Sequence, residues 1–209
     1  AILGSTGSIG RNTLDVVDRL GGAFRVTALA AGSNLTVLAA QVEKYRPALI
    51  SVGARRDAET IRGLARRFGS KVVWGAEGAV QVALAEGVDT VVSAIPGMSG
   101  FAPTLEAVRA GRRVALANKE SMVVGGALLR REAALSGARI IPVDSEHSGV
   151  FQCLAGVKRR HVRKVILTAS GGPFLKTPLH ELRRKTLAET LRHPRWVMGK
   201  KVTVDSATL

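Results

Sequence analysis

The sequence predicts an α/β fold in which a Rossmann-like, doubly wound parallel sheet is followed by part of a second α/β catalytic domain. Short β-branched runs alternate with longer segments of helical spacing through residue 143. Parallel strands need crossover connections, which are usually helices, so this alternation indicates a sheet covered on both faces. The regular alternation of short β-branched runs and helical segments ends after Asp144. We therefore expect a first domain over 1–143 and part of a second one over 144–209.

The expected elements of the first domain follow from these runs and their spacing. Between the strands, the helix that follows Asp57 shows the pattern well, because Ile61, Leu64, Ala65 and Phe68 fall at i, i+3, i+4 and i+7 and line one face. Asp57 is expected to cap this helix, with its arginines facing out. The expected strands are 1–3, 24–30, 48–52, 71–74, 90–94, 113–117 and 138–143.

The second domain begins with an expected helix over 146–154 and a Val- and Ile-rich strand over 161–169. Thr177-Pro178 predicts a cap followed by proline in the first helical position, and Thr186 with Glu189 matches a capping box. The run over 202–209 has the pattern of a strand with a polar end.

The composition indicates a globular chain. Its 209 residues are 46% apolar, and no apolar run approaches the roughly 20 residues that cross a bilayer. The single Cys153 excludes an internal disulfide. A formal net charge of +15 fits nucleic acid, a membrane surface or anionic small molecules. Because aromatic residues make up only 4%, we expect a phosphorylated small molecule, with no nucleic-acid or membrane partner.

A glycine-rich loop, Gly4-Ser5-Thr6-Gly7-Ser8-Ile9-Gly10, follows the first expected strand and precedes a helical pattern. Glycine permits a tight turn and close approach of the backbone to a ligand, and the amides that begin a helix carry partial positive charge. The context predicts a pyrophosphate-binding loop, although the spacing is GxxGxxG rather than GxGxxG. A purely structural turn is the alternative. No Walker lysine follows, which argues against a nucleoside triphosphatase.

The end of the second expected strand favours NADP over NAD. NAD-preferring enzymes usually place an acidic residue there to bind the ribose 2′-hydroxyl. Here the sequence reads Ala30-Ala31-Gly32-Ser33-Asn34, without a carboxylate to repel a 2′-phosphate. Ser33 and Asn34 can donate hydrogen bonds to that phosphate, or they can cap the following helix.

Two carboxylates, Asp144 and Glu146, stand two residues apart just after the β-branched pair Ile140-Ile141. In extended backbone, residues i and i+2 point the same way, so both carboxylates can reach one point in space. Oxygen ligands of this kind suit Mg or Mn, which keep positions open for substrate. The alternative is that both acids are solvated or cap a helix.

Three further motifs lie where ligands bind in open α/β sheets: LANKES at 116–121, SGGPF at 170–174 and HPRWVMGKKVTVDSATL at 193–209. Singly, each has a structural explanation, such as an ion pair for Lys119, a helix end for His193 or a core position for Trp196. Together with GSTGSIG at 4–10 and PVDSEHS at 142–148, they resemble the 1-deoxy-D-xylulose 5-phosphate reductoisomerase family over essentially the whole chain.

This resemblance implies NADPH and Mg or Mn as cofactors and a small phosphorylated sugar as substrate. Asp144 and Glu146 would ligate the metal, and Lys119, Glu146 and His193 would be catalytic, with His193 and Trp196 on a lid. Substrate contacts would come from Ser145, Ser170, His193, Trp196 and Ser206. Cofactor contacts would come from Gly4, Ser5, Thr6, Gly7, Ser8, Ile9, Gly32, Ser33, Asn34, Asn118, Lys119, Glu120, Met198 and Gly199.

The implied reaction is the isomerisation and reduction of 1-deoxy-D-xylulose 5-phosphate to 2-C-methyl-D-erythritol 4-phosphate in non-mevalonate isoprenoid biosynthesis. The cation would stabilise the oxyanion formed as the carbon skeleton rearranges, and NADPH would then deliver hydride. The resemblance implies an NADPH-binding domain over 1–143 and an incomplete catalytic domain over 144–209, because the family pattern continues past Leu209 with a third carboxylate ligand. We therefore expect this chain alone to bind NADPH weakly with little turnover, and the full-length enzyme to be a homodimer of the bacterial cytoplasm or plastid stroma.

Two rival interpretations remain at this point. One is another two-domain NADP-dependent oxidoreductase, such as a semialdehyde or homoserine dehydrogenase; the phosphorylating semialdehyde enzymes need a nucleophilic Cys, and Cys153 falls in an expected helix without an activating base. The other is a basic nucleic-acid-binding module, for which binding would depend steeply on salt.

Overall fold

The structure is a computed structural model that describes residues 1–168, 171–195, 197, 199 and 203–204. Its contacts separate two compact units, Ala1–Cys153 and Leu154–Leu209, each of which is described by itself. The first unit is built on a seven-stranded sheet in which every paired neighbour runs parallel. The predicted α/β fold is therefore confirmed, with one strand at each of the seven expected places.

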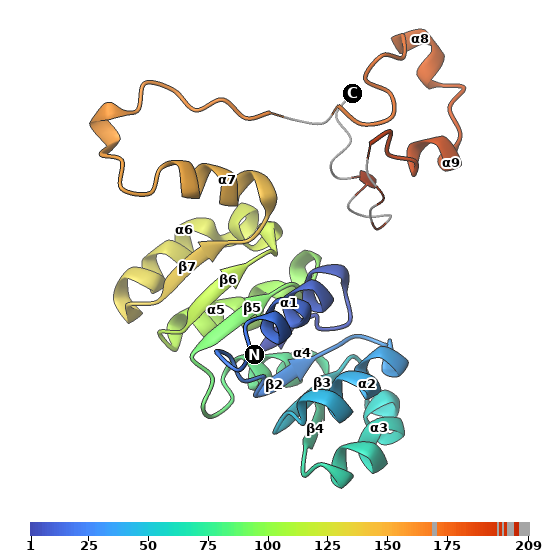
Figure 1. Ribbon diagram of the computed structural model, residues 1–209, viewed down its shortest axis with the longest axis vertical. Helices are drawn as coiled ribbons and strands as arrows, with labels where there is room; N and C mark the ends of the chain where they lie inside the picture. Colours follow the sequence, from blue (N-terminus) through green and yellow to red (C-terminus); the bar gives the residue numbers. More distant parts are fainter. Residues whose placement is uncertain (169–170, 196, 198, 200–202, 205–209) are drawn as a thin grey trace. The chain divides into compact units, whose positions relative to one another are not determined.

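The sheet is doubly wound from its centre. Its order is β4-β3-β2-β1-β5-β6-β7, so the chain starts at β1, runs outward to β4, and returns beside β1 to build the other half (Figure 1). The strands are β1 (Ile2–Leu3), β2 (Ala28–Ala30), β3 (Leu49–Val52), β4 (Lys71–Trp74), β5 (Thr90–Ser93), β6 (Arg113–Leu116) and β7 (Arg139–Pro142). The helices between and after them are α1 (Ser8–Arg19), α2 (Leu35–Tyr45), α3 (Arg55–Arg67), α4 (Gly75–Ala83), α5 (Phe101–Arg109), α6 (Lys119–Ser136) and α7 (Ser145–Cys153), with the 3-10 turn η1 (Gly97–Gly100) before α5.

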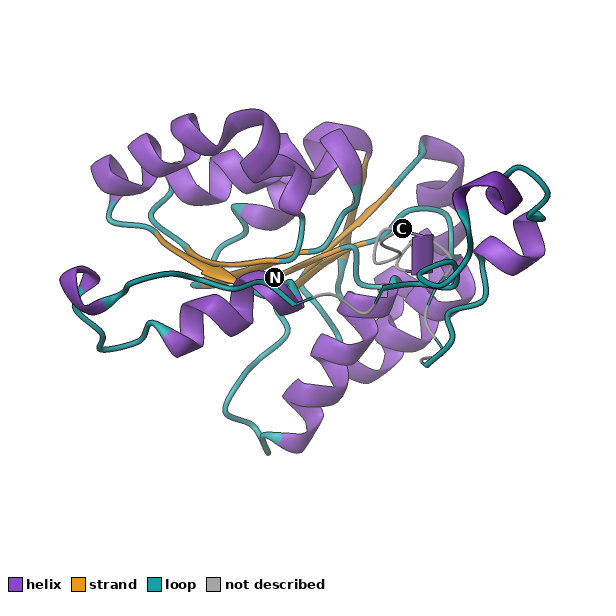
Figure 2. Cartoon of the chain, turned by 90° about the horizontal axis from the view of Figure 1, so that it is seen from above, coloured by secondary structure: helices purple, strands orange, loops and turns teal. Residues whose placement is uncertain are grey.

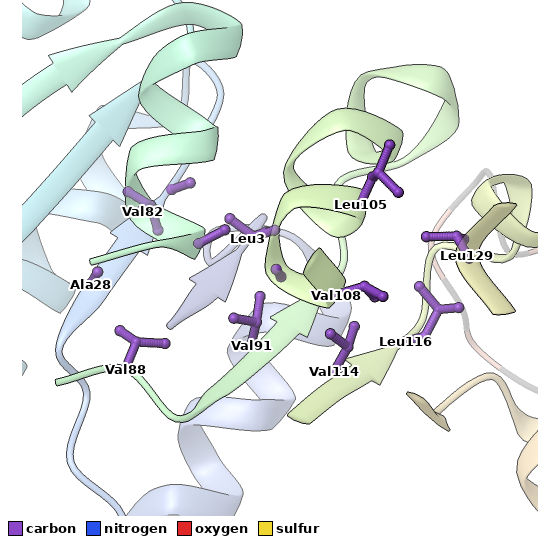
Figure 3. Close-up of a cluster of buried hydrophobic side chains, with 13 residues drawn as sticks. Leu3, Ala28, Val82, Val88, Val91, Leu105, Val108, Val114, Leu116 and Leu129 are labelled. Carbon is purple, nitrogen blue, oxygen red and sulfur yellow. The ribbon is translucent and has the colours of Figure 1, made fainter. Parts of the chain in front are cut away.

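Both faces of this sheet are buried under helices (Figure 2). Successive strand side chains point to opposite faces, so Leu3 joins the core under α4, α5 and α6, while its neighbour Ile2 joins the core under α1, α2 and α3. Figure 3 shows the first of these cores, where Val91 and Val114 from the strands meet Val108 of α5. Burial on both faces explains why the strands are continuous apolar runs rather than alternating ones.

Helix α3 follows the predicted face but begins earlier than expected. Ile61 and Ala65 are buried, and Leu64 and Phe68 pack against the same core, which confirms the predicted apolar stripe. The cap prediction is wrong: Ala54 is the N-cap, without a side-chain hydrogen bond, and Asp57 lies inside the first turn. An acidic residue there is stabilised by the helix dipole, which gives the same sequence signal as a cap.

The second unit departs more from the prediction. Residues 162–168 have no strand partner among the described residues, and Val165, Ile166 and Leu167 are exposed, so the β-rich run alone does not make a strand, which needs a paired neighbour. The capping box of Thr186 and Glu189 is confirmed at α9 (Leu187–Thr190). The other short helices are η2 (Arg159–His161) and α8 (Leu179–Leu182), where Pro178 is itself the N-cap. In the expected strand 202–209, Thr203 and Val204 are helical and the rest lies outside the described residues. None of the described helices is long and apolar enough to span a bilayer.

We predict that two glycine-to-alanine substitutions have opposite effects on stability. A Cβ on Gly10 would overlap the Gly4 carbonyl oxygen and lie 2.6 Å from the Ser5 Cα, both rigid backbone atoms. Gly10→Ala should therefore lower the free energy of unfolding by about 1–3 kcal/mol. Gly63 lies in α3 with nothing within 4 Å of the same position, so Gly63→Ala should raise it by about 0.5–1 kcal/mol. Urea unfolding followed by circular dichroism measures both, and equal effects would contradict the packing described at Gly10.

Candidate functional site

The predicted site residues of the first unit gather at one edge of the sheet. In a parallel sheet every strand ends at the same edge, and ligands bind there, where the chain reverses its strand order. The glycine loop follows β1, Ser33 follows β2, Lys119 follows β6 and Asp144 follows β7. Three inter-strand spacings separate β1 from β7, a distance of about 14 Å at about 4.8 Å per step.

The glycine loop forms a backbone cradle at the start of α1. The amides of Gly4 and Ser5 both donate to the carbonyl oxygen of Ala30, at 2.8 and 2.9 Å, which fixes the loop against β2. Gly4 has φ of 87°, and a Cβ there would lie 2.6 Å from the Ala94 carbonyl oxygen. Gly7 is the N-cap of α1 and offers no side-chain cap, so the first-turn amides are open to an anion. These features fit a pyrophosphate.

Two buried polar atoms beside the loop lack partners. Gln41 of α2 donates from Nε2 to the Ser5 carbonyl oxygen at 2.8 Å and so holds the glycine loop against α2. Its Oε1 and the Ser5 hydroxyl are both buried without a hydrogen-bond partner. Buried polar atoms of this kind are rare unless a ligand or ordered water completes them. They mark the loop as a place built to receive a polar group.

Asn118 ties the central loops together. Its amide nitrogen donates to the carbonyl oxygens of Ile95 at 2.7 Å and Gly97 at 2.9 Å, and to Glu120 at 3.1 Å. Its carbonyl oxygen accepts from the backbone amide of Ser121 at 3.0 Å and from the Ser121 hydroxyl. The side chain is 2% exposed and acts as the N-cap of α6. Its polar atoms are thus engaged in positioning the loop after β5 and the start of α6.

The acidic pair lies next to Lys119. The ammonium group of Lys119 is 2.9 Å from Asp144, and His147 approaches the other oxygen of Asp144 at 3.7 Å. The Ser145 hydroxyl donates to Glu146 at 2.7 Å. The structure therefore brings together four residues predicted to serve metal or substrate: Lys119, Asp144, Ser145 and Glu146.

The carboxyl groups of Asp144 and Glu146 are linked to each other through Lys119 and Ser145, since Lys119 contacts Asp144 and Ser145 donates to Glu146. Hydrogen bonds from Ser145 and from the backbone amide of Glu146 are the main causes that hold the pKa of Glu146 below its usual value, and the charge of Lys119 adds to them. The pair meets for a different reason than predicted, because α7 begins at Ser145 and Glu146 is helical rather than extended.

These oxygens fit a hard divalent cation as part of its shell. Mg or Mn takes carboxylate ligands readily, and ionised Glu146 is ready to bind. Among the described residues no group of three or more acidic, His or Cys side chains converges, so this unit offers two carboxylates and leaves the remaining positions to water, substrate or other ligands. Lys119 neutralises part of the charge of Asp144, and an incoming cation has to displace or share that contact.

The loop after β2 carries neutral donors only. Asn34 caps α2, since its side chain accepts from the Val37 amide at 3.2 Å, which confirms the capping alternative for this residue. That bond uses the oxygen of Asn34 and leaves its amide nitrogen as a donor. Gly32, Ser33 and Asn34 are all exposed at the sheet edge. The loop can contact a 2′-phosphate through neutral groups, without a carboxylate to repel it.

The remaining predicted residues belong to the second unit. His193 is 9% exposed, and its Nδ1 accepts from the Arg195 amide at 3.1 Å. Gly199 is exposed, and its carbonyl oxygen accepts from the amide and hydroxyl of Thr203. Ser170, Trp196, Met198 and Ser206 lie outside the described residues. Their roles stay predictions.

Comparison with known families decides the identity of this arrangement. A profile described as 1-deoxy-D-xylulose 5-phosphate reductoisomerase matches residues 1–126, and one described as the C-terminal domain of the same enzyme matches residues 140–209. The chain belongs to the 1-deoxy-D-xylulose 5-phosphate reductoisomerase family. The resemblance inferred from the five motifs is thereby confirmed.

Individual reductoisomerases show the same relation. The enzyme of Chlorobium chlorochromatii is 50% identical over 212 residues, covering 100% of this chain and 55% of its own length. That of Ruminiclostridium cellulolyticum is 46% identical over 209 residues, covering 100% of this chain and 54% of its own length. The chain thus spans about half the length of the curated relatives it matches.

Solved reductoisomerase structures match the fold closely. One, a complex with NADPH, fosmidomycin and magnesium, superposes with a TM-score of 0.90 at 36% identity, over 99% of this chain and 53% of its own. Another, from Zymomonas mobilis in complex with NADPH, gives a TM-score of 0.88 at 36% identity, over 99% of this chain and 53% of its own. NADPH, the predicted dinucleotide, is bound in both of these relatives, and magnesium, one of the two predicted metals, is bound in the first.

Sequence reasoning missed the loop after β5. Ala94 abuts Gly4, and Ile95 and Gly97 anchor Asn118, so this loop fixes the loops after β1 and β6 relative to each other. Its signal was present as Pro96-Gly97 directly after a strand, a turn at the point where the sheet reverses its order.

We predict that Asn118→Ala destabilises the chain far more than removal of a comparable exposed cap. The substitution leaves the Ser121 amide and the Ile95 and Gly97 carbonyl groups without their partner in a buried site, which should cost about 2–4 kcal/mol. Asn34→Ala removes one exposed cap bond and should cost about 1 kcal/mol or less. Urea denaturation without cofactor compares the two. Equal losses would show that Asn118 does not hold these loops.

Proposed function

We propose that the enzyme to which this chain belongs isomerises and reduces 1-deoxy-D-xylulose 5-phosphate to 2-C-methyl-D-erythritol 4-phosphate, using NADPH and a divalent cation. The observation that carries the proposal is the shared sheet edge, where a glycine cradle follows β1 and an acidic pair follows β7, three inter-strand spacings away, or about 14 Å at the usual strand spacing. The cradle would hold the dinucleotide, and the acidic pair would hold the cation that binds the substrate, both at this edge of the sheet. Family membership supports the same reaction.

Gly4 to Ile9 hold the pyrophosphate in this proposal, through backbone amides and the first turn of α1. Lys119 and Glu120, at the start of α6, stand toward the nicotinamide ribose. Asn118 acts by fixing these residues, because its own polar atoms are engaged by the protein. When bound, NADPH supplies the hydride, and the chain supplies orientation.

Asp144 and Glu146 provide carboxylate ligands to Mg or Mn, which supplies electrophilic stabilisation of the substrate oxygens. Lys119 balances the charge of Asp144 while no cation is bound, and it is placed to hold an anionic substrate oxygen when Asp144 is taken by the metal. Ser145 orients Glu146 through their 2.7 Å hydrogen bond. In the second unit we assign His193 and Trp196 to a lid that excludes water, and Ser170 and Ser206 to the substrate phosphate.

Three broader assignments belong to the same proposal. The functional boundary lies at 143/144, so that β7 ends the cofactor domain and the acidic pair begins the catalytic one. The full-length enzyme is a homodimer, with neither nucleic acid nor membrane as partner. The compartment is the bacterial cytoplasm rather than a plastid stroma, a choice supported by relatives such as those of Chlorobium and Ruminiclostridium.

We predict that cofactor and metal binding can be separated by substitution. Asp144→Asn removes a charged ligand, so the affinity for Mn²⁺ should fall about tenfold or more, while that for NADPH, held at β1, should change less than twofold. Asp89→Asn is the matched control, because Asp89 is exposed and precedes β5, at the opposite edge of the sheet. Mn²⁺ binding is measured by electron paramagnetic resonance and NADPH binding by its fluorescence.

The proposal fails if the unmodified chain binds NADPH no better than NADH, or if both aspartate variants bind Mn²⁺ equally. For the complete enzyme, the reaction is followed as substrate-dependent loss of NADPH absorbance with Mn²⁺ or Mg²⁺ present. Absorbance loss that persists after removal of all divalent cation would contradict the metal role of the acidic pair.

A further inference from the structure

We propose that Arg56, in the first turn of α3, is the residue that reads the 2′-phosphate of NADPH and so sets the preference of this chain for NADPH over NADH. The inference rests on the proposed function, because it assumes that a dinucleotide occupies the glycine cradle. The proposal adds a charged residue from the start of α3, which follows the neighbouring strand β3, to the neutral loop after β2.

The loop after β2 does not carry the charge that this specificity needs. A phosphate monoester bears about −1.5 to −2 charges at neutral pH. Ser33 and Asn34 offer only neutral donors, and the side-chain oxygen of Asn34 is already used to cap α2. Neutral donors serve a ribose hydroxyl as well as a phosphate, so discrimination requires a cation nearby.

The loop after β3 lies directly beside the loop after β2. Strands β2 and β3 pair in register, with Ala30 opposite Ser51. The contact continues past both strands, because the Gly53 amide donates to the Gly32 carbonyl oxygen at 3.1 Å. Gly53 has no side chain to separate the two loops, and a Cβ there would meet the Gly32 backbone at 3.6 Å. Arg55 and Arg56 follow within three residues.

Of these two arginines, Arg55 is directed away from the cofactor loop. Its guanidinium group lies 6.0 Å from the centre of the Trp74 ring, and its Nε donates to Glu59 at 3.3 Å. Trp74 ends β4, which lies on the far side of β3 from β2. Arg55 is therefore held toward the outer edge of the sheet.

Arg56 has no such restraint. Its side chain is 88% exposed, and its ion pair with Asp57 is long, at 3.8 Å. A phosphate dianion offers arginine a bidentate, charge-assisted contact that a carboxylate at this distance does not. Other basic residues of the sheet start strands, so they stand at the opposite edge: Lys71 in β4, Arg113 in β6 and Arg139 in β7.

Binding of NADPH and NADH to the 209-residue chain tests the assignment without any catalytic assay. Arg56→Ala should raise the dissociation constant for NADPH about tenfold or more and change that for NADH less than twofold, and Arg56→Lys should recover part of the loss. Arg55→Ala is the matched control, with the same charge change one residue away, and should change both constants less than threefold. Thermal unfolding shows whether each variant is folded.

The outcomes separate the inference from the function on which it rests. If the unmodified chain shows no preference for NADPH, the proposed function fails. If that preference is present and Arg56→Ala keeps it, the function stands and the role of Arg56 is wrong. An equal loss for NADPH and NADH would also overturn it, because it would show that Arg56 supports the loop rather than the 2′-phosphate. If Arg55→Ala produces the selective loss instead, the assignment to Arg56 is likewise overturned.

Discussion

The parallel pairing of seven strands is the constraint on which the site depends. Because every strand runs the same way, each connection must cross a face of the sheet, and every strand ends at one edge. Residues separated by more than a hundred positions, such as Gly4 and Asp144, are thereby placed at the same edge of the sheet. Burial of both faces fixes the register, since a shift of one residue would move Leu3 and Ile2 to the wrong cores.

That edge separates charges by position as well as by residue type. The glycine cradle presents backbone amides, the acidic pair presents carboxylates, and Lys119 stands between them in strand order and contacts Asp144 at 2.9 Å. A partly exposed ion pair of this kind contributes about 1 kcal/mol. In the proposed function its role is therefore orientation, because it holds Asp144 in place and is weak enough to yield when a divalent cation binds the carboxylate.

Sequence reasoning located the strands because a buried parallel strand has a clear pattern, and it located the glycine loop because only glycine fits at Gly4 and Gly10. Sequence reasoning was less successful where a structure depends on the pairing or position of a segment in the fold, which composition does not show. The run at 162–168 has the composition of a strand, but pairing decides strand formation. Asp57 has the composition of a cap, and its place in the first turn gives the same preference for an acid.

Contacts between loops that are distant in the sequence also could not be predicted from a single sequence. Nothing in the spacing of Asn118 shows that it binds Ile95 and Gly97 in the loop after β5, or that Gly53 binds Gly32. Both contacts follow from strand order, because β5 lies beside β6 and β2 lies beside β3. Neighbouring loops at the carboxyl edge therefore constrain one another even when their own sequences look unrelated. In our proposal, cofactor preference at the loop after β2 depends for the same reason on Arg56, which follows the neighbouring strand β3, so the end of one strand does not set this preference alone.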